Sequence, residues 1–226
     1  MKMQARQDYL KAVYTLSERS EWVSTTALSE HLAVRPPSVT AMIKKLSTVR
    51  PRLLEYKSHR GVSLTAAGRR IALDVMRRHR LIEQFLVEVL GFGWDEVHEE
   101  ADRLEHCVSD AFIERLDERL GFPTRDPHGR PIPSKAGEIE AVSEIRLSDV
   151  GVDETVRVTS VRSEEPSFLK YLSEVGLKPN TAVKVSAVVA VGNTMVLQLL
   201  GTTSADTLVI GLALAEKVCV TRDAGL

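Results

Sequence analysis

The chain has 226 residues, is 43% hydrophobic and carries a formal net charge of −1, which is the composition of a globular protein with room for two or three small domains. No apolar run approaches the ~18 residues that a membrane-spanning helix needs, and the N-terminus lacks the apolar core of a signal peptide. Two distant cysteines, Cys107 and Cys219, exclude a disulfide framework and are typical of the reducing cytoplasm. We therefore expect a cytoplasmic protein without a membrane partner.

The small net charge hides a division along the chain. Residues 1–80 contain 16 Lys and Arg against 6 Asp and Glu, whereas residues 81–226 contain 14 against 25. A basic first third indicates a polyanionic partner, and an acidic remainder indicates either cation binding or simple solvation.

The basic part begins with three predicted helices, over residues 7–16, 27–32 and 38–46. Residues 24–26 supply hydroxyl caps for the second helix, and Pro36 and Pro37 suit the start of the third. Apolar residues of the third helix recur at i, i+3, i+4 and i+7, and its other face carries hydroxyls and lysines that suit a DNA groove and its phosphates. Two predicted strands, 53–57 and 62–65, follow, joined by a basic turn.

Helix order, turn and hairpin together predict a winged helix-turn-helix, against the alternative of a small α/β domain that is basic for solubility. The expected DNA contacts, mostly to phosphates, are Arg35, Ser38, Thr40, Lys44, Lys45 and Arg60.

Metal-ligand side chains recur at helical spacing after this domain. Thr65 is expected to cap a helix from Ala66 to about Leu90, and Asp95 is expected to cap a second helix that runs to about Ser109. At about 100° per residue, one stripe of the second helix would carry four potential ligands, His98, Asp102, Glu105 and His106. His79 and Glu83 share a face of the first helix. This chemistry suits a divalent first-row metal, although a solvated acidic helix that contains histidines is the simpler alternative.

Apolar residues of segment 91–120, among them Phe92 and Phe112, lie off this stripe, and some are expected to form a homodimer seam. Residues 134–149 are polar and are expected to be a linker. From about Val150 the pattern becomes β, with predicted strands at 155–161, 182–191, 194–200, 208–210 and 216–220 and a helix at 167–175. Short strands in under 80 residues predict a small, partly open barrel.

Three segments resemble the diphtheria toxin repressor and manganese transport regulator family: RHRLIEQFL at 78–86, VHEEADRLEH at 97–106 and DPHGRPIP at 126–133. The resemblance covers essentially the whole chain. It implies a mainly α protein with a small β domain, in which residues 1–72 form a winged helix-turn-helix, 73–140 a helical dimerisation and metal-binding domain, and 150–226 an SH3-like barrel. It also implies a homodimer that binds a palindromic operator when loaded with metal and represses metal-uptake genes.

The family's primary site, carried onto matching positions, implies four ligands: Asp8, Asp102, Glu105 and His106. Iron-sensing members have sulfur ligands at the positions of Asp8 and Asp102. Three carboxylates and one imidazole form a harder, oxygen-rich site that suits Mn²⁺. We therefore expect a manganese-responsive repressor, with Fe²⁺ as the alternative metal and Zn²⁺ or Co²⁺ as surrogates.

The family's ancillary site implies His79, Glu83 and His98, completed from the barrel by Glu165 or, as second choice, Glu164. A further barrel ligand of the family falls on Phe168, which cannot bind a metal. Lys11 replaces an acidic residue that serves a closely spaced metal pair in the two-domain manganese regulators, so two separated sites are expected. On the helical wheel Cys107 lies away from the stripe and is expected to be packed and structural.

Three other interpretations stay open. A winged-helix regulator that responds to a small molecule or an oxidant would ignore chelators. A carboxylate-bridged metalloenzyme usually presents Glu-x-x-His from two helices, which segment 75–120 lacks, so neither catalysis nor an organic small-molecule substrate is expected. The third domain could instead bind a protein.

Overall fold

A computed structural model describes residues 3–17, 20–141, 143–201 and 207–222. The chain divides into two compact units. The first comprises Met1–His79, Leu104–Ser109 and Pro133–Ile139, and the second comprises Arg80–Arg103, Asp110–Ile132 and Glu140–Leu226. The predicted three-domain boundaries stay a prediction.

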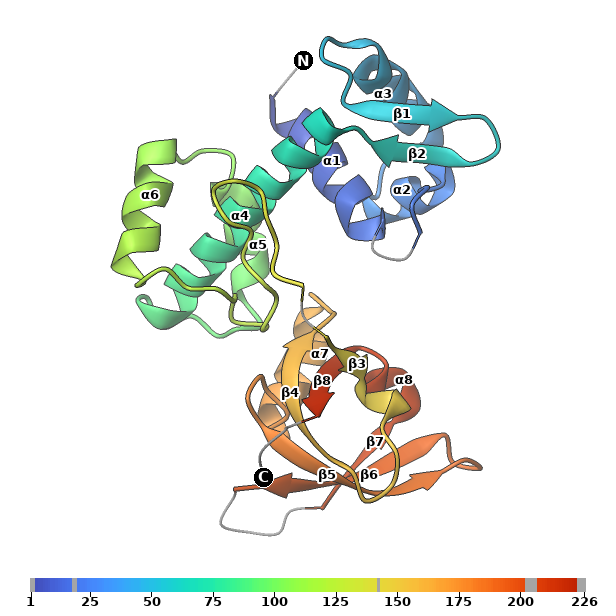
Figure 1. Ribbon diagram of the computed structural model, residues 1–226, viewed down its shortest axis with the longest axis vertical. Helices are drawn as coiled ribbons and strands as arrows, with labels where there is room; N and C mark the ends of the chain where they lie inside the picture. Colours follow the sequence, from blue (N-terminus) through green and yellow to red (C-terminus); the bar gives the residue numbers. More distant parts are fainter. Residues whose placement is uncertain (1–2, 18–19, 142, 202–206, 223–226) are drawn as a thin grey trace. The chain divides into compact units, whose positions relative to one another are not determined.

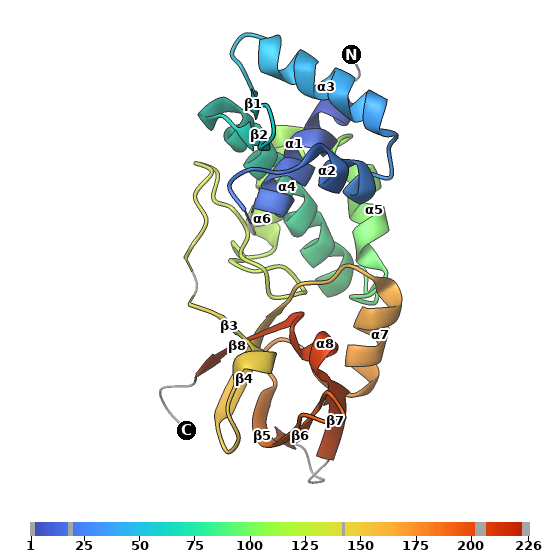
Figure 2. The same ribbon diagram turned by 90° about the vertical axis from the view of Figure 1, so that its right-hand side faces the viewer.

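The first unit begins with three helices and a hairpin: α1 (Met3–Ser17), α2 (Thr25–His31), α3 (Pro36–Thr48), β1 (Leu54–Lys57) and β2 (Gly61–Leu64). Helix α2 packs on both α1 and α3, and the antiparallel hairpin packs on α1 and α3 (Figures 1 and 2). Ser24 caps α2 by accepting a hydrogen bond from the Ala27 amide, as the sequence predicts. The buried faces of these elements meet in one apolar core around Leu10, Leu28 and Leu46.

Helix α4 (Ala66–Glu88) follows the hairpin, and its residues up to His79 belong to the first unit. The Thr65 hydroxyl accepts a hydrogen bond from the Gly68 amide, which confirms Thr65 as the cap of this helix. Among the described residues, no helix is long and apolar enough to cross a membrane.

The second unit adds α5 (Val97–Leu104), α6 (Asp110–Arg119) and a β-domain. That domain consists of β3 (Ile145–Arg146), η1 (Leu147–Asp149), β4 (Thr155–Val161), α7 (Pro166–Glu174), β5 (Ala182–Val189), β6 (Thr194–Leu200), β7 (Thr207–Gly211), α8 (Leu212–Ala215) and β8 (Val218–Arg222). Its antiparallel sheet has the order β3-β8-β4-β5-β6-β7, so the last strand lies between the first and second.

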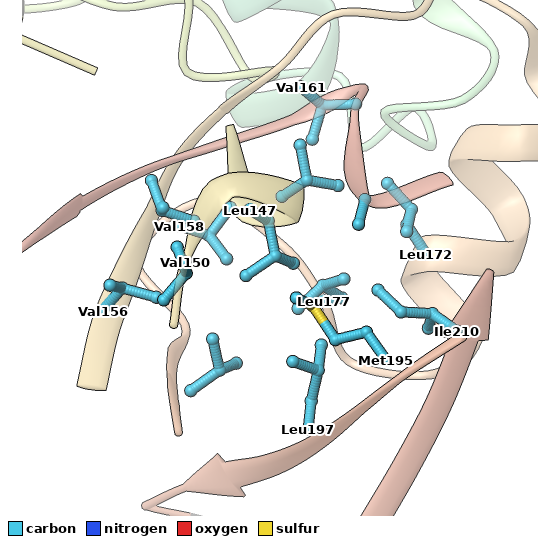
Figure 3. Close-up of a cluster of buried hydrophobic side chains, with 14 of the residues drawn as sticks. Leu147, Val150, Val156, Val158, Val161, Leu172, Leu177, Met195, Leu197 and Ile210 are labelled. Carbon is cyan, nitrogen blue, oxygen red and sulfur yellow. The ribbon is translucent and has the colours of Figure 1, made fainter. Parts of the chain in front are cut away.

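Alternate residues of the central strands point into the core of this sheet, as the period of two requires. Val156 and Val158 of β4, and Met195 and Leu197 of β6, are all buried (Figure 3). The predicted barrel is confirmed in its strands. The predicted linker is wrong for residues 145–149, which form β3 and η1 with Leu147 buried. The two-residue strand and single 3-10 turn are too short to give a periodic signal.

The predicted helix after Asp95 begins within one residue of the expected start, but its predicted end at Ser109 is wrong. Helix α5 runs only from Val97 to Leu104, and residues 105–107 form turns. Glu105 and His106 therefore follow the helix instead of extending its stripe. Cys107, expected to be packed, is exposed in this turn.

Candidate metal and DNA-binding sites

Helix α3 separates a buried face from an exposed one. Val39, Ile43 and Leu46 are buried against the first unit's core. Pro36 and Pro37 occupy the first helical positions, where a missing amide hydrogen costs nothing. All the expected contacts on or before this helix are exposed: Arg35, Ser38, Thr40, Lys44 and Lys45. The apolar stripe thus fixes the opposite, polar face outward, as a groove-reading helix requires.

The hairpin presents Arg60 beside its tip. His59 and Gly61 have positive φ values of 63° and 108°, which close the turn. A Cβ at Gly61 would lie 2.1 Å from the Val23 carbonyl oxygen, because Val23 and Val62 form a β-bridge. This contact anchors the hairpin on the helices and leaves Arg60 exposed. Arg50, Arg52 and Lys57 are also exposed cations of this segment that were not predicted as DNA contacts, although the local basic charge was a usable signal.

A carboxylate–imidazole cluster lies elsewhere in the first unit. The His106 Nε2 atom is 2.8 Å from Asp8 Oδ1 and 3.3 Å from Glu105 Oε1, so α1 and the turn after α5 meet here. The Gln7 side-chain oxygen lies 3.0 Å from His106 Nδ1. One ligand atom from each of Asp8, Glu105 and His106 lies within 4.8 Å of the others.

The electrostatics of this cluster reflect the burial of its acids. Burial raises the pKa of the Asp8 carboxyl, and the negative charge of Glu105 raises it further, whereas His106 and Lys11 lower it. Glu105 is only 2% exposed. Two carboxylates that repel each other beside an imidazole favour a bound cation, so this donor set fits a hard divalent metal.

Lys11 also contacts Glu105. Its Nζ atom donates hydrogen bonds to Glu105 Oε2 at 2.8 Å and Oε1 at 3.1 Å, and lies 3.0 Å from His79 Nδ1. The buried His79 Nδ1 is in turn 2.6 Å from Glu105 Oε2. Within the first unit, His79 therefore lies against Glu105, a member of the expected primary set.

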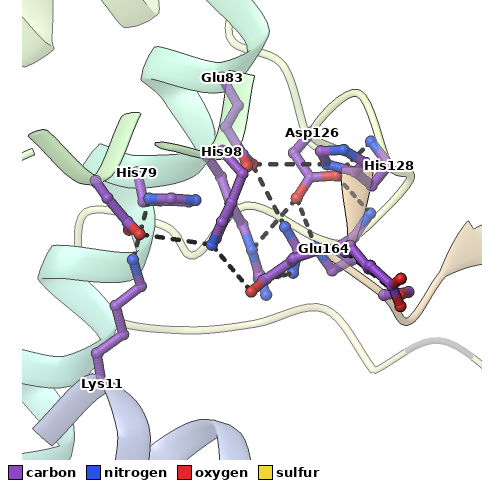
Figure 4. A network of polar contacts seen from close by, with 12 residues as sticks. Lys11, His79, Glu83, His98, Asp126, His128 and Glu164 are labelled. Atoms are coloured by element: carbon purple, nitrogen blue, oxygen red, sulfur yellow. Dashed lines mark hydrogen bonds and ion pairs between the residues drawn. The ribbon is translucent and has the colours of Figure 1, made fainter. Parts of the chain in front are cut away.

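The other expected ligands belong to the second unit. The His98 Nδ1 atom lies 3.3 Å from Glu83 Oε1, and its Nε2 atom lies 3.1 Å from Glu164 Oε2 and 3.5 Å from Asp102 Oδ2. Figure 4 shows His98 between Glu83 and Glu164. An imidazole with buried and half-exposed carboxylates on either side also fits a divalent metal.

The two barrel candidates, Glu165 and Glu164, differ in their contacts. Glu164 contacts His98, whereas Glu165 stands at the N-terminus of α7 and accepts a hydrogen bond from the Ser167 hydroxyl. The next residue, Pro166, begins α7, so Glu165 is the helix-flanking position. Phe168, which offers no ligand atom, has the Lys217 ammonium 4.9 Å from the centre of its ring.

Sequence reasoning missed a buried polar network beside Glu83 (Figure 4). Asp126 accepts hydrogen bonds from the amides of His128 and Arg130 and pairs with the Arg130 and Arg80 guanidinium groups. Arg130 also pairs with Glu164 and lies 3.4 Å from Glu83. Two guanidinium groups thus already neutralise Asp126, so we assign no metal to the set formed by Asp126 and His128 with Glu83, and we consider Glu83 as a ligand only together with His98. The DPHGRPIP motif was the available signal.

His128 is the least accessible member of this network. Its Nε2 atom lies 2.8 Å from the Trp94 carbonyl oxygen, and its ring stacks on Trp94. Its Nδ1 atom has no hydrogen-bond partner among the described residues and lies 3.8 Å from Glu83. Burial alone would lower the pKa of His128, but the carboxylates of Glu83 and Asp126 raise it above its ordinary value.

Comparisons with known proteins identify the family. The iron dependent repressor N-terminal DNA binding domain matches residues 1–62, the iron dependent repressor metal binding and dimerisation domain matches 65–134, and the FeoA domain matches 145–222. The iron-dependent repressor IdeR of Mycobacterium leprae is 32% identical over 201 residues, which cover 84% of this chain and 86% of that protein. The chain belongs to the diphtheria toxin repressor family.

Solved structures agree with this assignment. A manganese-dependent transcriptional repressor in complex with manganese has a TM-score of 0.86 at 35% identity, covering 96% of this chain and 99% of that one. ScaR with bound Zn²⁺ has a TM-score of 0.79 at 32% identity, covering 96% and 99%. The diphtheria toxin repressor fold, with a winged helix, a helical dimerisation domain and an SH3-like domain, is thereby confirmed. This family member is a metal-dependent transcriptional repressor that binds DNA and dimerises.

Proposed function

We propose that this repressor responds to Mn²⁺ in the cytoplasm and, when loaded, binds a palindromic operator as a homodimer to control metal-uptake genes. The observation that carries the proposal is the cluster of Asp8, Glu105 and His106, which offers carboxylate and imidazole donors. Asp102 is the proposed fourth ligand. This set contains no sulfur donor, and its hard oxygen donors suit Mn²⁺ better than thiolate or thioether ligands would.

The ancillary ligands in this proposal are His79, Glu83 and His98, with Glu164 from the β-domain in place of Glu165. The contacts of His98 with Glu83 and Glu164 support that choice. Both proposed sites bind and hold an ion, and we infer that the protein catalyses no reaction.

Residues of the first unit couple the ion to DNA. Asp8 lies on α1, which packs against α2 and the hairpin, while Glu105 and His106 follow α5. A bound ion would supply positive charge, and the carboxylates of Asp8 and Glu105 could then lie close together without repelling each other. Held together, these ligands fix α1 and favour one arrangement of the recognition helices, which in a dimer must reach major grooves about 34–36 Å apart. A coupling of about 1–3 kcal/mol per site is typical.

The proposed DNA contacts are Arg35, Ser38, Thr40, Lys44 and Lys45 around α3, with Arg60 beside the hairpin tip. Their exposure and the basic charge of the region support the proposal. Most would contact phosphates, which position the domain without reading sequence.

Fe²⁺ is the second candidate effector. Several curated relatives bear the name iron-dependent repressor, which favours this alternative. Affinity alone does not make an oxygen-rich site select Mn²⁺, because Fe²⁺ and Zn²⁺ bind most such sites more tightly. Coordination geometry and the availability of each metal in the cell would therefore determine whether Mn²⁺ or Fe²⁺ is the effector.

Operator-binding fluorescence anisotropy, titrated with Mn²⁺, Fe²⁺ and Zn²⁺, tests the proposal. We expect Mn²⁺ to activate the wild type, and the double variant Asp8→Met/Asp102→Cys to shift toward Fe²⁺. The exposed pair Glu118→Met/Asp149→Cys is the matched control and should behave as wild type. An equal Mn²⁺ response in both double variants would remove the hard-ligand argument. DNA binding that survives chelation and the His106→Ala change would instead establish a metal-independent regulator.

A further inference from the structure

Lys11 makes contacts that neither DNA binding nor metal ligation explains. It follows Asp8 by three residues on α1, and its side chain is 19% exposed. Its ammonium group lies within 3.1 Å of both carboxylate oxygens of Glu105 and of His79 Nδ1. Figure 4 shows the Lys11 side chain pointing toward His79. Glu105 and His79 are both 2% exposed, so the charge on Glu105 is held away from water.

The ammonium group therefore neutralises the buried carboxylate of Glu105, as a bound metal ion would. A carboxylate buried without a counter-ion is strongly destabilising. An ammonium group offers three donors and one positive charge, and here it approaches the donor atoms that a divalent ion would use: two carboxylate oxygens and an imidazole nitrogen.

We propose that Lys11 is an internal cation that competes with the divalent metal for Glu105. This inference rests on the proposed function of Glu105 as a ligand. Without metal, Lys11 neutralises the buried charge of Glu105. When the ion binds, Lys11 must give up or share the carboxylate, and its positive charge repels the ion. Lys11 therefore raises the concentration of free metal at which the repressor loads.

The same contacts give Lys11 a second consequence. It touches Glu105 of the proposed primary set and His79 of the proposed ancillary set. Metal binding at either set therefore changes the surroundings of the same ammonium group, so that it alters the metal affinity of the other set.

An ordinary structural ion pair is the competing explanation, and it makes a different prediction. A purely structural pair stabilises the protein to the same extent with and without metal. A competitor stabilises only the metal-free protein, because the ion takes over the neutralisation of Glu105. Comparing the two states of a Lys11 variant separates these explanations.

The experiment uses the full-length protein and the variants Lys11→Met, Lys11→Gln and Lys170→Met. Lys11→Gln keeps a hydrogen-bond donor but removes the charge, and it replaces Lys11→Met in the test if Lys11→Met does not fold. Lys170 is an exposed residue of α7 and is the matched control. Free Mn²⁺ is measured by electron paramagnetic resonance during titration, and melting temperatures are recorded with and without Mn²⁺.

Both Lys11 variants should bind Mn²⁺ on the order of tenfold more tightly, since removal of one like charge close to an ion in a partly buried site has at least this effect. Their metal-free melting temperatures should fall, while their metal-loaded ones should stay near wild type. The proposal is overturned if the Lys11 variants bind Mn²⁺ no more tightly than the wild type. It is also overturned if their melting temperatures fall equally with and without Mn²⁺. If His106→Ala binds Mn²⁺ as tightly as the wild type, the proposed function itself is overturned. If His106→Ala weakens Mn²⁺ binding but the Lys11 variants do not behave as expected, only the proposal for Lys11 is overturned.

Discussion

Ala33 has a left-handed backbone, with φ of 51°, in the turn between α2 and α3. Its amide donates to the Glu30 carbonyl, and the Val34 amide donates to Ser29, so the turn is fixed by the chain on both sides. This conformation costs an L-residue roughly 1–2 kcal/mol, whereas glycine adopts it freely. The turn that orients the recognition helix is therefore strained at one residue.

Ala33→Gly should raise the free energy of unfolding by about 1 kcal/mol, because it relieves this strain. The matched control is Ala41→Gly on the exposed face of α3, where the same substitution should cost about 1 kcal/mol as a helix-interior glycine. Thermal or urea unfolding of the two variants measures the change in the free energy of unfolding that each substitution causes. A loss of stability in both variants would contradict the role of the turn.

The two neighbouring glutamates, Glu164 and Glu165, show that adjacent residues of the same type can have different partners. Their sequence context ranks them almost equally, yet only Glu164 contacts His98, because Pro166 starts α7 and Glu165 takes the flanking position. Where a helix starts therefore affects which of two adjacent side chains can contact a given partner.

At the scale of elements, α3 is the clearest success of sequence analysis. Of its four apolar residues at helical spacing, three are buried and Met42 is partly buried, while its lysines are exposed. Helix α5 is the clearest failure, since it ends at Leu104 and leaves Glu105 and His106 in a turn. Periodicity predicts the face of a helix well, but it carries no information on how far a polar helix continues.

The exposed face of α3 gives a test at this scale. Each phosphate that a cation neutralises contributes about 0.9 to the slope of log K against log salt concentration. Lys44→Ala and Lys45→Ala should each reduce the slope by about this amount, with little change in sequence preference. Operator and non-operator titrations at several salt concentrations measure it, with Lys170→Ala on α7 as control. A changed preference among operators at constant slope would show that these lysines read bases.

At the scale of the whole molecule, segment 91–120 carries apolar side chains with two different fates. Val97, Ile113 and Leu116 are buried within the protomer, whereas Phe112 on α6 is 46% exposed. Because residues 65–134 match a metal binding and dimerisation domain, we propose that this exposed aromatic residue belongs to the seam between two protomers.

Phe112→Glu should therefore weaken the dimer, because a charge would be buried in the seam. Light scattering after size-exclusion chromatography should show a monomer at micromolar concentration. Val191→Glu, at a fully exposed position between β5 and β6, is the control and should remain a dimer. A dimer that persists in both variants would place the seam elsewhere.

Spacing within single elements and short contiguous motifs were enough to predict the winged helix, the strands of the barrel and the residue types of the candidate ligands. Which of these residues lie in contact could be learned only from the folded chain. Lys11 and Glu105 are separated by 94 positions, and Arg130 and Glu164 by 34. Local periodicity fixes the face on which a side chain stands, whereas the partner that it finds depends on how buried faces pack together, which no short stretch of sequence encodes.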